Sequence, residues 1–408
     1  MTAVNRRAPL SVDPLPASGA WRTGDPVGQR RFVAFDAERR FQLEGGGSLK
    51  GVTVAYETWG ELNEDASNAI LVCHALTGDS HAAGPSGPGH PTEGWWNDLI
   101  GPGRAIDTNQ YFVVCTNVLG GCQGTTGPAS TNPETGQPYG SSFPVVTIRD
   151  IVRTQAAVAD ELGITQWFSV LGGSMGGMQS LEWGVMFPDR VRSLGALATC
   201  AAASAFQIGQ SSVQRSTIIL DPQWNGGDYY DAAPGEGPHF GLAMAREQAT
   251  LTYKSEELIE TAQGRREKDV MDRGFAPWQR FAVEGYLDYQ GEKLVRRFDA
   301  NSYLVINKAM DLHDVGRGRG GIERALARIT APVLTLSITS DALYPPRQQQ
   351  FLHDAVVASG GVCQYELVHS NAGHDGFLTE HQQVGAVLRS FLAKIESSEF
   401  SENEGINS

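Results

Sequence analysis

The chain has 408 residues, of which 41% are hydrophobic and 19% charged, a composition typical of a folded globular protein. Its formal net charge is -14, and no basic cluster lies between aromatic residues, which argues against a nucleic-acid partner. The sequence contains no run of about 18 apolar residues, so no transmembrane helix is predicted.

The cysteines and the N-terminus indicate a compartment. There are five cysteines, an odd number without a C-x-x-C pair, which argues against a disulfide framework or a zinc site. The first 20 residues contain Arg6 and Arg7 but no apolar segment of the kind found in secretory signals. A cytoplasmic protein is expected.

Short apolar runs alternate with helical patterns along most of the chain. Residues 1–28 are rich in Pro, Gly and Arg and predict a flexible lead-in, and residues 396–408 predict a disordered tail. Several of the apolar runs have no polar face, as in strands of a parallel sheet that is buried on both sides. The predicted strands are 52–56, 69–73, 111–115, 168–171, 194–198, 333–336 and 363–368.

The helical patterns complete an α/β alternation. Thr147 and Asp150 form a capping-box start, and the helical stripe that follows ends at Gly163. The alternation stops between residues 202 and 329, where only helical patterns occur, and resumes at Ala331. We therefore expect a core of residues 29–201 and 330–395 with a helical lid, 202–329, over the carboxyl edge of the sheet. A separate helical domain is the alternative.

The strongest local signal is a glycine-rich turn between a predicted strand and a predicted helix. Gly172, Ser174 and Gly176 satisfy the G-x-S-x-G pattern of a nucleophile elbow, where side chains beside the strained serine would clash. A tightly packed glycine turn is the alternative. A dinucleotide fingerprint is excluded because the G-x-G-x-x-G spacing is not met.

A serine nucleophile needs an imidazole base, and the imidazole needs an acid that fixes its tautomer. In α/β-hydrolases, the fold in which this elbow occurs, the chain order is serine, acid, histidine, with the last two on loops after late strands. Asp341 follows the strand predicted at 333–336, and His374 follows the one at 363–368. His369 competes with His374 but lies at the strand end. The prediction is an α/β-hydrolase fold with the triad Ser174, Asp341 and His374.

The loop after residue 73 is the expected source of an oxyanion-hole donor. One donor should be the N–H of Met175, and we assign the other to the N–H of Leu76. Three histidines, His74, His81 and His90, lie near this loop. Their spacing matches no metal-ligand motif and no acidic residue completes one, so no metal site is predicted.

Several longer motifs resemble one family, the homoserine O-acetyltransferases. The resemblance extends from about residue 31 to 392. The related homoserine O-succinyltransferases and serine O-acetyltransferases share much of the pattern. The motifs are residues 56–63 (YETWGELN), 74–78 (HALTG), 94–96 (GWW), 117–124 (NVLGGCQG), 127–128 (GP), 172–177 (GGSMGG) and 373–375 (GHD).

The resemblance implies ping-pong acetyl transfer from acetyl-CoA to the hydroxyl of L-homoserine, an early step of methionine synthesis, without a tightly bound cofactor. It implies that Asp375 binds the α-amino group and Arg246 the carboxylate of the amino acid. A zwitterion needs one anchor of each sign, and arginine grips a carboxylate bidentately. Asn117, Arg215 and Tyr253 are weaker pocket candidates. The resemblance also implies a homodimer, for which the lid offers a surface.

Other functions remain open on the sequence alone. A serine esterase would use the same triad and differ only in its handling of water. A catalytically silent interaction protein with the same fold is a third possibility. A succinyl donor would need a cation near its distal carboxylate, and no extra arginine lies by the loop at 74–78 or in residues 117–127, which favours acetyl. Serine and homoserine differ by one methylene, which a pocket distinguishes by only about 1–3 kcal/mol.

Overall fold

The centre of the molecule is an eight-stranded sheet. The computed structural model describes residues 15–36, 38, 40–267 and 280–397. The strand order in the sheet is β1-β4-β8-β5-β9-β10-β11-β12. These strands are β1 (Arg31–Ala34), β4 (Thr53–Trp59), β5 (Ala69–Cys73), β8 (Phe112–Thr116), β9 (Ser169–Gly173), β10 (Leu194–Leu197), β11 (Val333–Ile338) and β12 (Cys363–Val368).

Six neighbouring strands, from β8 to β12, run parallel, and β4 and β1 pair antiparallel at one edge. All seven predicted strands are confirmed within a few residues. The sequence missed β1, where only Val33 is buried, so no apolar run marks it. Two further pairs, β2 (Phe41–Gln42) with β3 (Ser48–Leu49) and β6 (Ile100–Gly101) with β7 (Ile106–Asp107), lie outside the main sheet.

Helices cover both faces of the sheet. On one face, α1 (Ile148–Glu161), α2 (Met175–Met186) and α9 (Pro346–Ala358) pack against side chains such as Leu71 and Val170. On the other, α11 (His381–Glu396) packs against the alternate side chains, such as Ile70 and Leu171. The predicted capping box at α1 is present: Asp150 N–H donates to Thr147 Oγ1, and Thr147 N–H donates to Asp150 Oδ2.

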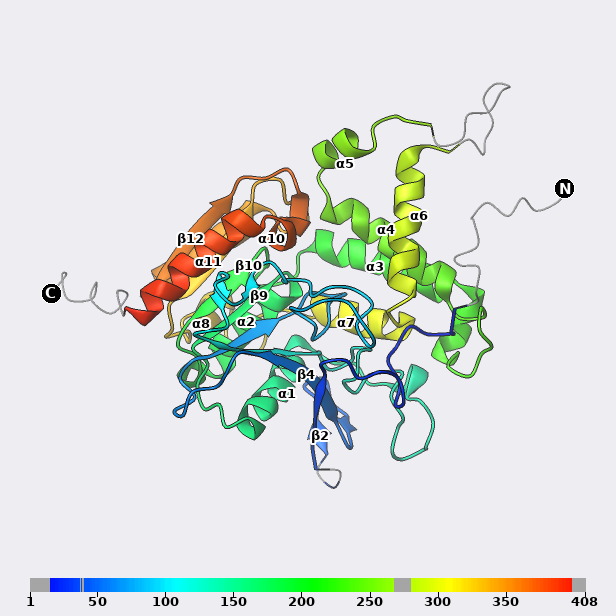
Figure 1. Cartoon of the computed structure of the whole chain (residues 1–408), viewed down its shortest axis with the longest axis horizontal. Helices are drawn as coiled ribbons and strands as arrows, with labels where there is room; N and C mark the ends of the chain where they lie inside the picture. The colour runs from blue at the N-terminus through cyan, green and yellow to red at the C-terminus, as the bar shows by residue number, and fades with distance from the viewer. Residues whose placement is uncertain (1–14, 37, 39, 268–279, 398–408) are drawn as a thin grey trace.

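Helices also fill the chain between β10 and β11. In the described parts of residues 202–329 the named elements are all helical, and strand pairing there is limited to isolated bridges. Figure 1 shows α3, α4 and α6 packed together at one end of the molecule, away from α11. These elements are α3 (Ala205–Ile219), η3 (Pro222–Gly227), α4 (His239–Tyr253), α5 (Glu256–Ala262), α6 (Ala282–Val295), α7 (Ala300–Asp311) and α8 (Ile322–Leu326).

The N-terminal segment differs from the flexible lead-in expected over residues 1–28. Residues 1–14 lie outside the described part of the chain, but Ala17, Ser18 and Ala20 are buried. Gly19 N–H donates to Phe298 O in the helical region, and Trp21 N–H donates to Cys122 O in the core. Residues 15–21 are thus a strap between the two regions, held by backbone hydrogen bonds and by the buried bond from Ser18 Oγ to Asp299 Oδ1, and these contacts leave no periodic side-chain pattern.

The C-terminal region ends differently from the sequence prediction. The tail expected from residue 396 starts within α11, where Glu396 accepts a hydrogen bond from Tyr111 Oη at 2.9 Å, and residues 398–408 lie outside the described part. Short helices complete the fold: η1 (Gly140–Ser142), η2 (Pro188–Arg190), η4 (Gly373–Asp375) and α10 (Gly376–Thr379). No helix in the described residues is long and apolar enough to cross a membrane.

Candidate active site

Ser174 lies on a sharp turn between β9 and α2. Its backbone has φ 59° and ψ -124°, a strained conformation for a residue with a side chain. The flanking glycines make the turn possible. A Cβ on Gly172 would lie 2.4 Å from the main chain of Gly176, and one on Gly176 would lie 2.1 Å from Cys73 O. The predicted elbow is therefore built by backbone contacts that exclude any side chain at these positions.

The three predicted triad residues form one hydrogen-bonded chain. His374 Nε2 lies 2.9 Å from Ser174 Oγ, and His374 Nδ1 lies 2.7 Å from Asp341 Oδ2. Asp341 Oδ1 accepts the N–H groups of Leu343 and Tyr344 at 2.9 and 2.8 Å, which fixes the carboxylate. All three side chains are almost fully buried. This geometry allows the imidazole to take a proton from the serine while the carboxylate holds its tautomer.

Aromatic rings enclose His374. The ring centroids of Tyr344, Phe377 and Tyr253 lie 4.9, 5.4 and 5.8 Å from that of His374. Burial raises the pKa of the Tyr344 phenol well above its usual range, so this group stays neutral. The rings limit the access of water to the imidazole, and they restrict the orientation of the imidazole within the site.

The loop predicted to supply an oxyanion donor lies against the serine. Leu76 lines the same cavity as Ser174, and Met175 is the first residue of α2. Within the described residues, neither the N–H of Leu76 nor that of Met175 has a hydrogen-bond acceptor. Both are therefore available to an oxygen bound next to Ser174 Oγ, where the positive end of the α2 dipole also acts.

A cavity of about 200 Å³ opens above Ser174 between the sheet and the helical region. The core contributes residues 75–79 and His374, and the lid contributes polar side chains from α3, α4 and α7. Those lid residues are Gln207, Gln210, Ser211, Gln214, Arg246, Thr252, Tyr253 and Asn307.

Arg246 and Asp375, the two predicted contacts of a zwitterion, both line this cavity. The Arg246 guanidinium lies over the Tyr253 ring at 5.4 Å and 3.5 Å from Thr77 Oγ1. It forms no ion pair with any carboxylate in the described residues, so its charge is available to a ligand. Asp375 differs: its Oδ2 is 2.9 Å from Lys254 Nζ, a partner that the sequence reasoning did not foresee.

Comparison with known proteins agrees with this geometry. Residues 68–381 match the family model described as the alpha/beta hydrolase fold. The homoserine O-acetyltransferase of Thermobifida fusca (strain YX) is 54% identical over 94% of this chain and 99% of its own length. That of Clavibacter michiganensis subsp. michiganensis is 52% identical over 92% and 96%. The chain belongs to the homoserine O-acetyltransferase family.

Solved structures place the protein among acyltransferases and esterases of one fold. The homoserine O-acetyltransferase from Bacillus anthracis has a TM-score of 0.81 at 31% identity, covering 89% of this chain and 97% of its own. Esterase E22 has a TM-score of 0.80, also at 31% identity, covering 89% and 99%. By its family the protein is an acyltransferase, although the same scaffold also carries esterases.

Two of the weaker pocket candidates, Asn117 and Arg215, do not line the cavity above Ser174. Asn117 is buried behind it, where its carbonyl accepts a hydrogen bond from Thr125 Oγ1. Arg215 turns towards α7, where its Nη2 forms an ion pair with Asp311 at 2.7 Å. Tyr253, the third candidate, does line the cavity.

Arg297 is a cavity residue that the sequence reasoning missed. Its Nη1 donates to Thr77 O at 2.8 Å, on the very loop where no extra arginine was expected. Arg297 lies between α6 and α7, about 220 residues from that loop in sequence, so only the tertiary fold brings them together. Because Arg297 places a cation at this loop, the sequence argument for an acetyl over a succinyl donor no longer holds.

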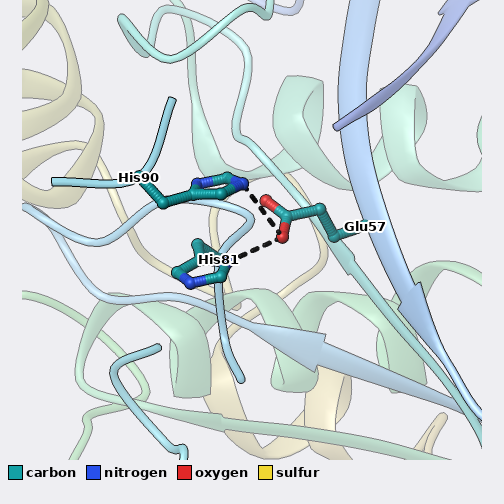
Figure 2. A group of neighbouring side chains, drawn as sticks. All are labelled: Glu57, His81 and His90. Carbon is teal, nitrogen blue, oxygen red and sulfur yellow. Dashed lines mark hydrogen bonds and ion pairs between the residues drawn. The ribbon is translucent and has the colours of Figure 1, made fainter. Parts of the chain in front are cut away.

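The expectation that no acidic residue lies beside the three histidines near the loop is wrong, because one contacts two of them. Figure 2 shows Glu57 facing His81 and His90. Glu57 Oε2 lies 2.8 Å from His81 Nδ1 and 3.7 Å from His90 Nε2, and Glu57 Oε1 accepts Ser80 Oγ at 2.8 Å. Glu57 is on β4, so the sequence alone did not place it beside the histidines.

The geometry of this cluster does not suit a metal ion, and a shared proton fits only the pair of Glu57 and His81. The two imidazoles stack with centroids 3.8 Å apart and planes at 9°, so their in-plane lone pairs do not converge on one point. His90 Nε2 also accepts the N–H of Gln29 at 2.9 Å. Burial opposes a charge on His81, but the hydrogen bond and charge of Glu57 outweigh it and raise its pKa, whereas burial lowers the pKa of His90.

Proposed function

We propose that the protein transfers the acetyl group of acetyl-CoA to the side-chain hydroxyl of L-homoserine through an acetyl ester on Ser174, in amino-acid biosynthesis. The observation that carries the proposal is the juxtaposition of the Ser174–His374–Asp341 chain with an aspartate and an arginine in one cavity, where the arginine has no carboxylate partner among the described residues. The names of the relatives support the acceptor and the acetyl group.

In the first half-reaction Ser174 Oγ attacks the thioester carbonyl while His374 Nε2 takes its proton. The tetrahedral oxyanion is stabilised by the N–H groups of Leu76 and Met175. The C–S bond then breaks, and the leaving thiolate takes the proton from His374 to give CoA as a free thiol. Asp341 keeps its negative charge throughout and stabilises the imidazolium.

In the second half-reaction the hydroxyl of homoserine occupies the place of the thiol. His374 takes its proton, the oxygen attacks the ester carbonyl, and Ser174 leaves with the proton returned. Arg246 would hold the carboxylate bidentately, and Asp375 would accept the α-ammonium group. Because Lys254 pairs with Asp375 in the free enzyme, the incoming ammonium must share or displace that partner.

Cations around the cavity suit an anionic donor such as acetyl-CoA. Burial and the charges of Arg297 and Arg246 lower the pKa of Lys293, so the three groups lie close enough to act on one another. They create a local positive field in a chain whose net charge is -14. This field attracts the anionic donor, while the direct contact of Arg246 is assigned to the carboxylate of homoserine. All five cysteines are free thiols, which suits a reducing compartment such as the cytoplasm.

The test follows thiol release from acetyl-CoA with and without homoserine. Rapid thiol release limited to one equivalent without homoserine, and sustained release with it, is the expected result. Continuous release in the absence of homoserine would show a hydrolase instead, the activity that the esterase neighbours make the second candidate. Intact mass should show one acetyl group on the wild-type chain and none on Ser174→Ala. Competition with succinyl-CoA and with serine fixes the donor and the acceptor.

We also infer that two copies of the chain associate through the lid. Large apolar side chains are exposed along α3 and at the two ends of α4. On the α3 side, Phe206, Val213 and Leu220 recur every seven residues and are 57%, 52% and 78% exposed. This repeat produces a stripe on one helical face, which a symmetric second copy can cover. On α4 the exposed apolar residues are Phe240 and Leu251.

A further inference from the structure

Both proposed oxyanion donors belong to peptide groups that are held from their carbonyl side. The N–H of Leu76 shares its peptide plane with Ala75 O, and the N–H of Met175 shares its plane with Ser174 O. Ala75 O lies 2.8 Å from His74 Nδ1 and accepts the N–H of Gly78 at 2.9 Å. Ser174 O accepts Thr199 Oγ1 at 2.7 Å, besides the N–H groups of Gly177 and Met178 at 3.0 and 3.2 Å. Since a peptide is planar, fixing its carbonyl fixes the direction of its N–H.

The hydrogen bonds of His74 determine its tautomer. Val118 N lies 3.1 Å from His74 Nε2, and a backbone N–H can only donate, so Nε2 carries no proton. The proton is therefore on Nδ1 and is donated to Ala75 O. Burial lowers the pKa of His74, which keeps the ring neutral beside Asp79 and Arg297. A charged ring would also place a second N–H against that of Val118.

A buried amide ties the two donor segments together. Gln179 Nε2 lies 3.1 Å from His74 O and 3.2 Å from Met175 O, so one side chain links the loop at 74–78 to the first turn of α2. Gln179 Oε1 in turn accepts Gln155 Nε2 at 2.7 Å. The hydrogen bonds that Ala75 O and Ser174 O accept also polarise their own peptides, and this strengthens the N–H groups of Leu76 and Met175 as donors.

We infer that His74 and Thr199 are positioning residues of the oxyanion hole, which aim and polarise the N–H groups of Leu76 and Met175 through Ala75 O and Ser174 O. The inference rests on the proposed acyl transfer at Ser174. It adds a role for a histidine that the sequence alone assigned to no site. Neither side chain needs to touch the substrate to act in this way.

Two substitutions separate the hydrogen bonds of His74. His74→Asn keeps a donor near the position of Nδ1 and removes the acceptor for Val118. His74→Gln keeps an acceptor near the position of Nε2 and removes the donor to Ala75 O. The rate at which 4-nitrophenyl acetate acetylates Ser174 tests the oxyanion hole without CoA or homoserine. The affinity for a small alkylboronic acid measures how well the site stabilises a tetrahedral adduct on Ser174.

We expect His74→Gln to lower the acetylation rate and the boronic acid affinity together, by roughly 10- to 100-fold, less than the loss of a whole donor. His74→Asn should stay within a few-fold of the wild type, and the Kd for CoA should be unchanged in both. Equal losses in the two variants, or a parallel loss of CoA binding in His74→Gln, would overturn the inference for His74.

Thr199→Val supplies a second, nearly isosteric test on the other peptide. It should lower the acetylation rate and the boronic acid affinity with an unchanged KM, and a change in KM alone would overturn its role.

His313→Asn is the matched control for the His74 variants, because His313 is a buried histidine that also contacts a main-chain carbonyl, Cys200 O at 3.0 Å. If acetyl-CoA fails as donor while 4-nitrophenyl acetate acetylates Ser174, the proposed function fails and the His74 comparison still stands.

Discussion

At the scale of single residues, Arg246 and Arg215 show how the fold gives two lid arginines different roles. Arg246 faces the cavity without a carboxylate partner in the described residues, while Arg215 is paired with Asp311. A charge-assisted hydrogen bond contributes about 1.5–3 kcal/mol. We therefore expect Arg246→Gln to raise the KM for homoserine roughly 10- to 100-fold and to leave acetylation of Ser174 by acetyl-CoA close to the wild-type rate.

Arg215→Gln is the matched control for that prediction. It leaves Asp311, which is almost fully buried, without its cation, so it should lower the melting temperature; Arg215 reaches the cavity only through Asn307, so the KM for homoserine should change much less than in Arg246→Gln. Steady-state kinetics at saturating acetyl-CoA and thermal unfolding measure the two effects. An unchanged KM in Arg246→Gln would remove the assigned carboxylate anchor.

The Glu57–His81–His90 cluster makes a prediction about stability and pH. His81 has a raised pKa in the folded state, so its charge stabilises the fold below the unfolded pKa, and this contribution is lost as the pH rises through the folded value. Glu57→Gln removes the counter-charge. Asp79 and Arg30 are the other charged groups that act on these rings.

We expect Glu57→Gln to lower the free energy of unfolding more at pH 5.5 than at pH 8.5, where His81 in the wild type has lost much of its charge. Burial lowers the pKa of His90, and the charge of Glu57 partly offsets this, so removing Glu57 lets His90 destabilise the variant more as the pH falls and enlarges the same difference. Urea unfolding of both proteins at the two pH values measures this difference in the free energy of unfolding. A cost that is the same at both pH values would mean that His81 is neutral beside Glu57.

At the scale of elements, the turn between β9 and α2 sets the position of the nucleophile. A methyl group on Gly176 would meet Cys73 O at 2.1 Å, and neither backbone can give way without moving Ser174. Gly176→Ala should therefore cost about 1–3 kcal/mol of stability and most of the acetylation rate. Gly45→Ala, at an open position in the turn between β2 and β3, should change neither.

The elements that the sequence predicted are those whose signals are local. The buried parallel strands show as apolar runs, the α1 start shows as Thr147 with Asp150, and the elbow shows as glycines around a serine. What the sequence missed depends on contacts between distant segments. β1 has one buried side chain, the 15–21 strap is held by hydrogen bonds to distant segments, and Glu57 and Arg297 reach their partners only across strands or helices.

In the candidate site, too, the residues with local sequence signals were predicted and those that depend on contacts between distant segments were not. Ser174, Asp341 and His374 were found because the order of their loops along the chain follows from the topology of the sheet. The pairing of Asp375 with Lys254 could not be foreseen, since Lys254 follows α4 in the lid. Nothing in one sequence states how an insertion of more than a hundred residues docks on the core.

At the scale of the whole molecule, the lid has two surfaces with opposite character. Its inner surface supplies polar side chains to the cavity, and its outer surface exposes a stripe of apolar side chains on α3. An exposed stripe of this kind on a folded protein marks an interface more often than a solvated face. Covering the stripe with a second copy would also brace α3, which carries Gln207, Gln210 and Gln214 into the cavity.

Val213→Glu places a charge in the middle of that stripe, between Phe206 and Leu220. If two copies meet there, the variant should have half the molar mass of the wild type in sedimentation equilibrium and a reduced kcat, because the wall of the cavity loses its support. Val145→Glu is the control, since Val145 is exposed to a similar extent, 53%, but lies outside the lid, just before α1. A wild-type chain that sediments as a monomer at micromolar concentration would overturn the dimer, and a dimeric Val213→Glu variant would place the interface elsewhere.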